Sequence, residues 1–197
     1  GLLPKPDIVI HADTGAEMPE TMKHIEEWVI PYCEEVLNIP FQVVKSHRGT
    51  IYDDYYERGI IPIMGWRSCT DIFKIRPQRK AIRQIVGNKR GMVLAQCWLG
   101  ITTDEEHRRT DSNVKWCEIT YPLLDYHRVS RQECIERILE EKLEVIKSGC
   151  YHCPYAGSAF YFELRKNHPD LFDKALELEA NAERETLKRV GRPLRQG

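Results

Sequence analysis

The most restrictive feature of the sequence is a strand–helix–strand pattern within its first 45 residues. Residues 7–12 are a short run of β-branched and apolar side chains that ends in the polar turn Asp13-Thr14-Gly15, which predicts a buried strand. Residues 19–37 repeat apolar side chains at helical spacing, and Pro31 is expected to kink or shorten that helix. Residues 41–45 predict a second strand. A helix between two strands is typical of a βαβ unit with parallel strands.

The remaining sequence continues this alternation. Residues 46–66 lack a clear period and predict a long loop with a short helix at 52–58. Further elements are expected as helices at 77–86, from Ser130 (with Glu133 in a capping box) to Ser148, and over most of 158–190, and as strands at 91–100 and 116–123. The pattern predicts an α/β protein with parallel strands and a helical C-terminal part.

Charge and hydropathy exclude several classes of protein. The chain has 29 basic and 30 acidic residues, a net charge of -1, which argues against a protein that mainly coats nucleic acid. No apolar run approaches the roughly 20 residues of a membrane helix, and no signal-peptide pattern is present. We therefore expect a cytoplasmic protein that makes no membrane contact. Seven cysteines without an export signal argue against a disulfide framework and point to metal binding or thiol chemistry.

The sharpest local motif is Cys150-Tyr151-His152-Cys153-Pro154. Two thiolates at this spacing reach one metal or cluster from a single turn. The motif alone leaves open a redox dithiol, half of a zinc site, half of an iron–sulfur site, or two inert buried thiols. A redox dithiol normally opens a helix after a strand, whereas this motif follows a predicted helix. A zinc site needs more ligands, for which Cys69, Cys117 and His152 are candidates.

Two charged stretches are candidate anion sites. Residues 74–90 contain seven Lys and Arg and no acidic residue. These residues are either a solvated helix face or a surface that binds an anion through Lys74 and Arg76, which lie near the predicted helix start. The stretch also permits a local contact with nucleic acid. Residues 104–109 follow the predicted strand at 91–100 and contain Arg108, a natural partner for phosphate or sulfate. In open parallel sheets ligands bind beyond the carboxyl ends of strands, so this stretch and the Asp13 turn are expected at one edge.

Taken together, these segments resemble the phosphoadenosine-phosphosulfate (PAPS) reductase family of the adenine-nucleotide α-hydrolase-like superfamily, which also contains ATP pyrophosphatases and sulfurtransferases. The resemblance extends from about Asp7 to Glu179, and the order of its motifs is more specific than any one of them. Its matching residues are Ala12 to Glu17 with Pro19-Glu20-Thr21, Cys69 with Lys74 and Pro77, Gly100-Ile101 with Asp104, Glu105 and Arg108, Tyr121-Pro122-Leu123, and Cys150 to Pro154. The chain resembles phage and mobile-element reductase-like proteins and the sulfurtransferases of DNA phosphorothioation more than it resembles the assimilatory enzymes.

The resemblance implies a fold layered α/β/α around a mainly parallel sheet, with a nucleotide-binding-like core at 1–125 and a helical region at 126–197, packed together as one domain. It implies an adenine nucleotide as ligand, either ATP or a sulfonucleotide (PAPS or adenylylsulfate, APS). The residues that it implies for nucleotide, phosphate or sulfate binding are Asp13, Thr14, Lys74, Arg76, Asp104 and Arg108. It also implies a four-iron–four-sulfur (4Fe-4S) cluster, which adenylylsulfate reductases hold with a Cys-Cys pair and a later C-x-x-C. Here Cys69 matches the first cysteine of that pair and Thr70 the second. Cys69, Cys150 and Cys153 thus supply three thiolates, as in related sulfur-transfer enzymes with one open iron, and Cys117 or Cys97 is a candidate fourth ligand.

Two family features have no counterpart in the sequence. The phosphate loop, a Ser-Gly-Gly-x-x-Ser-type turn, is expected upstream of Gly1, and the C-terminal Glu-Cys-Gly-type cysteine of the reductases is missing. We therefore favour sulfur transfer of the ATP pyrophosphatase type, with a sulfur donor protein as partner, over a thioredoxin-coupled oxidoreductase. The alternatives are a non-catalytic interaction module stabilised by zinc, an inactive fragment of the family, and a domain with reduced, unliganded cysteines.

Overall fold

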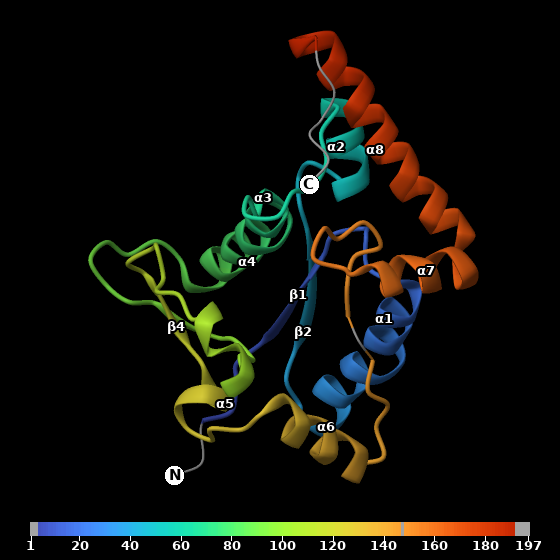
Figure 1. The fold of residues 1–197 in the computed structure, drawn as a ribbon. Helices are drawn as coiled ribbons and strands as arrows, with labels where there is room; N and C mark the ends of the chain where they lie inside the picture. The colour runs from blue at the N-terminus through green and yellow to red at the C-terminus, as the bar shows by residue number, and fades with distance from the viewer. Residues whose placement is uncertain (1–3, 147, 192–197) are drawn as a thin grey trace. The chain divides into compact units, whose positions relative to one another are not determined.

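The computed structural model describes residues 4–146 and 148–191. Backbone contacts divide the chain into two compact units. The first contains the chain up to Lys80 and from residue 148 onward, and the second is Ala81–Ile146. Each unit has a two-stranded parallel sheet (Figure 1). The predicted mixture of helices and parallel strands is confirmed, whereas the layered arrangement around one sheet and the boundary near residue 125 stay predictions.

The first unit contains the predicted βαβ arrangement. Strand β1 (Val9–Asp13) pairs in parallel with β2 (Phe41–Lys45), so that Asp13 lies opposite Lys45 at the carboxyl ends. The helical segment between them consists of α1 (Pro19–His24) and the π-helical turns η1 (Ile25–Val29) and η2 (Tyr32–Val36). Pro31 lies between the two π turns, so the helix is widened at this proline, which has no N–H to donate, and continues beyond it.

A long helix follows α2 (Ile51–Arg58) and includes α3 (Ser68–Thr70), η3 (Asp71–Ile75) and α4 (Arg76–Val86). The predicted start at Pro77 was wrong. The π turn before Pro77, closed by the Arg76 N–H and the Asp71 carbonyl, accommodates the missing proline N–H within the helix. Lys74 and Arg76 therefore lie well inside a helix and not near its start.

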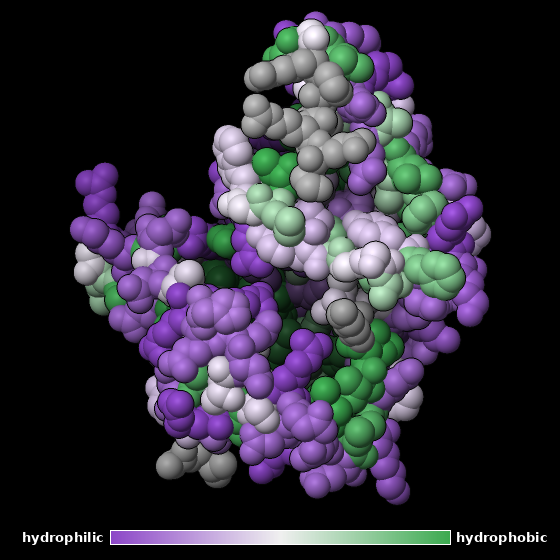
Figure 2. Space-filling model, in the orientation of Figure 1, coloured by the Kyte–Doolittle hydropathy of each residue, from purple (hydrophilic) through white to green (hydrophobic). Residues whose placement is uncertain are grey.

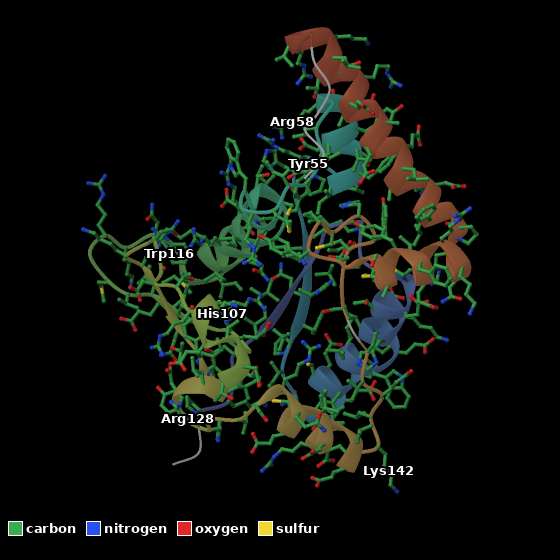
Figure 3. All side chains as sticks on the ribbon, in the orientation of Figure 1. Tyr55, Arg58, His107, Trp116, Arg128 and Lys142 are labelled. Carbon is green, nitrogen blue, oxygen red and sulfur yellow. The ribbon has the colours of Figure 1, made fainter. Side chains whose placement is uncertain are left out.

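The C-terminal helices α7 (Ser158–Asn167) and α8 (Pro169–Val190) complete the first unit. Helix α8 runs alongside α2 (Figure 1), where Tyr52 donates to Glu177 at 2.7 Å and Asn181 to the Tyr56 carbonyl at 2.7 Å. Tyr55 and Arg58 also project from α2 (Figure 3). One hydrophobic core joins these elements, and its buried members are Ala16, Ile51, Tyr55, Phe73, Tyr151, Leu164, Ala175 and Leu178.

The second unit pairs β3 (Ala95–Trp98) in parallel with β4 (Cys117–Thr120). A 3-10 segment η4 (Thr103–Arg108) connects them, and α5 (Pro122–Asp125) and α6 (Arg131–Glu140) follow β4. The predicted capping box of Ser130 and Glu133 is confirmed. Helix α6 ends at Glu140 and not at Ser148, because Lys142 adopts a left-handed backbone with φ of 59°.

Hydrophilic side chains dominate the face shown in Figure 2, and hydrophobic ones form separate patches on it. No helix among residues 4–146 and 148–191 is long and apolar enough to cross a bilayer.

Candidate functional site

The candidate site begins at the turn that follows β1. The Asp13 carboxylate accepts the N–H of Gly15 at 2.8 Å and pairs with the Lys45 ammonium at 2.9 Å, across the carboxyl ends of β1 and β2. Partial burial works to raise the pKa of Asp13, but Lys45 and the Gly15 N–H outweigh it and hold the pKa below its ordinary value. Asp13 is therefore a fixed carboxylate, and Lys45 is a cation that the sequence analysis did not single out.

A buried carboxylate organises the next residues. Thr14 is fully buried and donates both its hydroxyl, at 2.7 Å, and its N–H, at 3.1 Å, to the Glu17 side chain. The Glu17 side chain is only 5% exposed, and its counter-cation is Lys74, whose Nζ lies 3.8 Å from Glu17 Oε1. Lys74 comes from the long helix, so this ion pair ties that helix to the turn after β1. Burying a carboxylate without such partners would cost several kcal/mol.

The C-x-x-C motif is joined to the same turn through the backbone. Glu17 and Cys150 form an antiparallel β-bridge. On either side of this bridge the Met18 N–H donates to the Gly149 carbonyl at 3.1 Å, and the Tyr151 N–H to the Ala16 carbonyl at 3.0 Å. The motif itself turns through a bond from the Cys153 N–H to the Cys150 carbonyl at 3.1 Å. Two segments more than 130 residues apart in the sequence thus form one site.

The Cys150 thiol lies among charged groups. Burial raises the pKa of Cys150 to about 11; Lys74 works to lower it, whereas Glu17 and Cys153 raise it further. The neighbouring Thr14 hydroxyl also works to lower the pKa of Cys150. Cys150 is therefore a protonated thiol at neutral pH, because its desolvation outweighs the attraction of Lys74.

Two histidines, His11 and His152, lie close enough to Glu17 for its charge to act on their pKa values. His152 is 7% exposed, neither of its ring nitrogens has a hydrogen-bond partner within the described structure, and burial lowers its pKa to about 4. The Nε2 of His11, on β1, is also buried without such a partner, and burial lowers its pKa against the opposing effect of Glu17. The sequence analysis named His152 only as a candidate zinc ligand and did not single out His11.

The structure brings the predicted cysteines only partly together. Cys69 and Cys150 both pack against the hydrophobic core of the first unit, and Ser68, next to Cys69, hydrogen-bonds Tyr55 at 2.7 Å. Across residues 4–146 and 148–191, no three His, Cys, Asp or Glu side chains are arranged to hold a metal ion. Cys97 and Cys117 lie on β3 and β4 of the second unit, and their role as a fourth ligand stays a prediction.

The other predicted anion-binding residues have carboxylate or backbone partners. Arg76 pairs with Asp71, with Nε 2.8 Å from the carboxylate. Arg108 pairs with Glu105 at 2.5 Å. Asp104 accepts the N–H of Arg131 at 2.6 Å, at the start of α6. Lys74 and Arg76 thus face carboxylates in this structure, and the binding of phosphate or sulfate by these residues stays a prediction.

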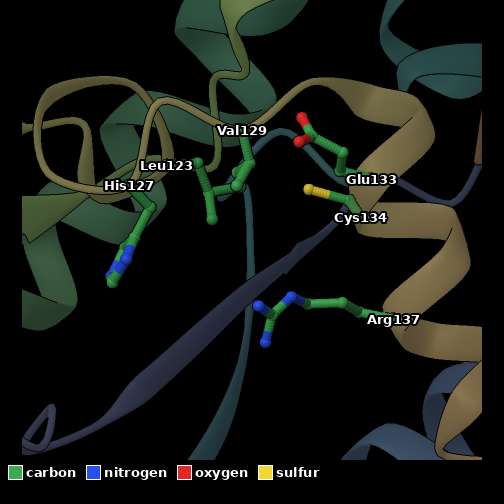
Figure 4. A pocket seen from close by; sticks show the side chains of 6 residues that line it. All are labelled: Leu123, His127, Val129, Glu133, Cys134 and Arg137. Atoms are coloured by element: carbon green, nitrogen blue, oxygen red, sulfur yellow. The ribbon is translucent and has the colours of Figure 1, made fainter.

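A cavity of about 420 Å³ lies within the second unit, lined by Leu123, His127, Val129, Glu133, Cys134 and Arg137. His127 and the pair Cys134 and Arg137 extend from opposite walls (Figure 4). Its Glu133 is engaged in the capping box, whose Ser130 N–H and hydroxyl hold the pKa of Glu133 below its ordinary value. The sequence analysis did not find this cavity, which depends on how α6 packs.

Comparison with known proteins gives a distant relative. No family model matches the chain. An uncharacterized protein of Methanocaldococcus jannaschii is 23% identical to it over 196 residues, which cover 93% of this chain and 42% of that protein. The chain therefore spans less than half the length of this relative.

Proposed function

We propose that the protein binds an adenine nucleotide and transfers sulfur, as its resemblance to the PAPS reductase family implies. The observation that supports this proposal is the union of the turn after β1 with the C-x-x-C motif, which surrounds Glu17 with Thr14, Lys74 and Cys150. Ligands of parallel sheets bind at the carboxyl ends of strands. A nucleotide at the ends of β1 and β2 would therefore lie beside a pair of cysteines.

Two lysines would receive its phosphates. Lys45 and Lys74 are both paired with carboxylates, and their side chains are 71% and 44% exposed, so both are accessible to an anion. An entering phosphate would compete with Asp13 and Glu17 for these cations. Lysine binds phosphate as a compact point charge, which suits a site where the anion replaces a carboxylate partner.

The two thiols would supply the sulfur chemistry in a balanced sequence. An acceptor oxygen attacks the α-phosphorus of ATP, and pyrophosphate leaves. The terminal sulfur of a persulfide on one cysteine then attacks the activated carbon, and AMP leaves. The other cysteine attacks the resulting disulfide, releases the thiolated product and forms a Cys150–Cys153 disulfide. Formation of this disulfide supplies the two electrons that reduce the transferred sulfur to the thiol level. An external dithiol reduces that disulfide, and a sulfur donor protein renews the persulfide.

The two cysteines would have different roles in this sequence. Burial and the neighbouring Glu17 keep the Cys150 thiol protonated, so it reacts slowly with a sulfur donor. Cys153 is therefore the persulfide carrier, and Cys150 is the thiol that closes the disulfide. Because Cys69, Cys150 and Cys153 are not gathered as metal ligands, no step of this sequence passes through an iron–sulfur cluster.

ATP affinity tests the nucleotide part of the proposal. Lys74→Gln is expected to weaken ATP binding about tenfold or more, since a hydrogen bond to a charged group contributes about 1.5–3 kcal/mol. Lys80→Gln, an exposed lysine on the same helix, is the matched control and should change it less than about twofold. Equal affinities for the two variants, or no ATP binding at millimolar concentration, would contradict the proposal.

A second candidate function is a non-catalytic module stabilised by a metal. The observation that favours it is that Cys150 lies in a backbone bridge and its thiol stays protonated. A thiol held in this way is better suited to a structural role than to nucleophilic attack. Metal binding would displace the thiol protons and close the ligands around the ion. Metal and sulfide analysis after anaerobic purification separates the two. Zinc lost in Cys150→Ser, with no ATP binding, favours the module, whereas iron with acid-labile sulfide favours the cluster that the resemblance implies.

A further inference from the structure

A short turn between α2 and α3 presents large apolar side chains to solvent. Ile63 and Trp66 face each other in an antiparallel β-bridge, and Gly65 closes the turn with φ of 84°. Trp66 is 72% exposed, the largest exposed fraction of any large hydrophobic side chain in the described parts of the chain. Met64 is 65% exposed. Exposed apolar side chains held in a defined turn are typical of a surface that binds a partner.

Two contacts fix this turn against the segment that follows the C-x-x-C motif. The Gly65 N–H donates to the Tyr155 hydroxyl at 3.1 Å, and the Arg67 guanidinium lies 5.0 Å from the centroid of the Tyr155 ring. Tyr155 is itself 53% exposed. Trp66, Arg67 and Tyr155 therefore form one surface, which we call the aromatic platform. The contacts of Tyr155 with Gly65 and Arg67 hold the platform in place, so binding would not cost the entropy of ordering these side chains.

The charge around the aromatic platform is positive. Neither residues 59–70 nor residues 150–162, the two segments that build it, contain an acidic residue, and Arg67 is their charged side chain. The long helix that begins at Ser68 adds four cations before the first unit ends, and its one acidic residue up to that point, Asp71, is paired with Arg76. The cations are Lys74, Arg76, Arg79 and Lys80, of which Lys74 is already paired with Glu17. This balance complements a polyanion, whereas the whole chain has a net charge of only -1.

We propose that the aromatic platform binds single-stranded nucleic acid, with bases stacked on Trp66 and Tyr155 and backbone phosphates near Arg67, Arg79 and Lys80. Exposed aromatic rings combined with cations are how proteins hold single strands, because every base has a flat π face. A free nucleotide would need an enclosing pocket, whereas a strand gains from several open contacts at once. The inference goes beyond the proposed function and does not depend on it.

Fluorescence anisotropy with labelled DNA and RNA strands of about 20 nucleotides, at about 50 mM salt, tests the proposal. Trp66→Ala is expected to weaken binding about tenfold or more, in line with the loss of one stacked base. Trp28→Ala is the matched control, since Trp28 is a 49% exposed tryptophan on η1, and should leave the affinity unchanged. Arg67→Gln should reduce the salt dependence of binding by about one phosphate contact. Unlabelled single strands should compete, and millimolar ATP should not.

Three results would overturn the proposal. The first is equal affinity of the wild-type protein and Trp66→Ala, or an equal loss in Trp28→Ala. The second is displacement of the labelled strand by ATP, which would assign the platform to a free nucleotide. The third is binding of anionic lipid vesicles that depends on Trp66 and occurs without any affinity for strands. Cys150→Ser should retain strand binding, so failure of the sulfur chemistry and failure of this platform are distinguishable.

Discussion

Replacing Gly15 by alanine is expected to disrupt the turn on which the candidate site is built. Gly15 has a left-handed backbone with φ of 68°, which side chains other than glycine rarely adopt. A methyl group there would lie 2.7 Å from the Cβ of Thr50 and still closer to its methyl carbon. Thr50 cannot easily retreat, because its hydroxyl accepts the Asp53 N–H at 3.1 Å and donates to the Asp53 carboxylate at 2.7 Å at the start of α2.

The magnitude follows from these separate effects. A left-handed alanine costs about 1–2 kcal/mol. The forced overlap costs about 1–3 kcal/mol, and loss of the Thr50 cap about 1 kcal/mol. The reduced entropy of the unfolded chain returns about 0.4–1 kcal/mol. The free energy of unfolding should therefore fall by about 4 kcal/mol.

Gly49→Ala is the matched control, since Gly49 has φ of 79° but a methyl group there would meet nothing closer than the Asp53 carboxylate at 4.0 Å. It should lower the free energy of unfolding by about 1 kcal/mol, the conformational part alone. Urea unfolding followed by circular dichroism measures both variants. Equal losses in Gly15→Ala and Gly49→Ala would refute the reasoning, because they would mean that Thr50 does not press on the turn.

Two further predictions concern the titration of the site. Lys74 lowers and Glu17 raises the pKa of the Cys150 thiol. At pH 8, about the pH at which free thiols begin to ionise, Lys74→Met should therefore slow the alkylation of Cys150 by iodoacetamide, and Glu17→Gln should speed it. Peptide mapping with Cys134 as internal reference measures both rates, and equal rates in the two variants would contradict this electrostatic account. The pKa of His152 is about 4 in the folded protein against an ordinary 6.5, so the folded state binds fewer protons between these values and stability should fall by about 3 kcal/mol as pH drops through that window. His152→Gln should lose this part of the pH dependence of unfolding, and an unchanged profile would show that His152 titrates normally.

Helices and strands that are determined by residues close together in the sequence were predictable. The strands at 7–12 and 41–45 follow from β-branched runs, and their parallel pairing follows from the helix between them. The Ser130 capping box requires only residues three apart. The helix start at Pro77 was wrong because a proline at a first turn and a proline after a π turn look alike in one sequence. The helix end at Ser148 was wrong because nothing local marks the left-handed Lys142.

The candidate site was only partly predictable. Thr14, Lys74 and Cys150 each belong to a motif that the sequence displays, and the structure brings them together. The group that unites them, Glu17, entered the sequence analysis only as the last residue of the matching segment Ala12 to Glu17. Its burial depends on the bridge to Cys150, a contact between distant segments that no local pattern encodes. The hydrogen bond between Gly65 and Tyr155 could not be predicted either, because it too joins distant segments.

The measurement that tests the central claim most directly is the location of sulfur on the protein after incubation with a polysulfide donor. Mass spectrometry of peptides would compare the wild-type protein with Cys150→Ser and with Cys134→Ser, a cysteine of the second unit. The account predicts a persulfide on Cys153 in all three proteins, and a Cys150–Cys153 disulfide after sulfur release only where Cys150 is present. Sulfur spread equally over Cys134 and Cys153, or release without that disulfide, would contradict a role of the C-x-x-C motif in sulfur transfer.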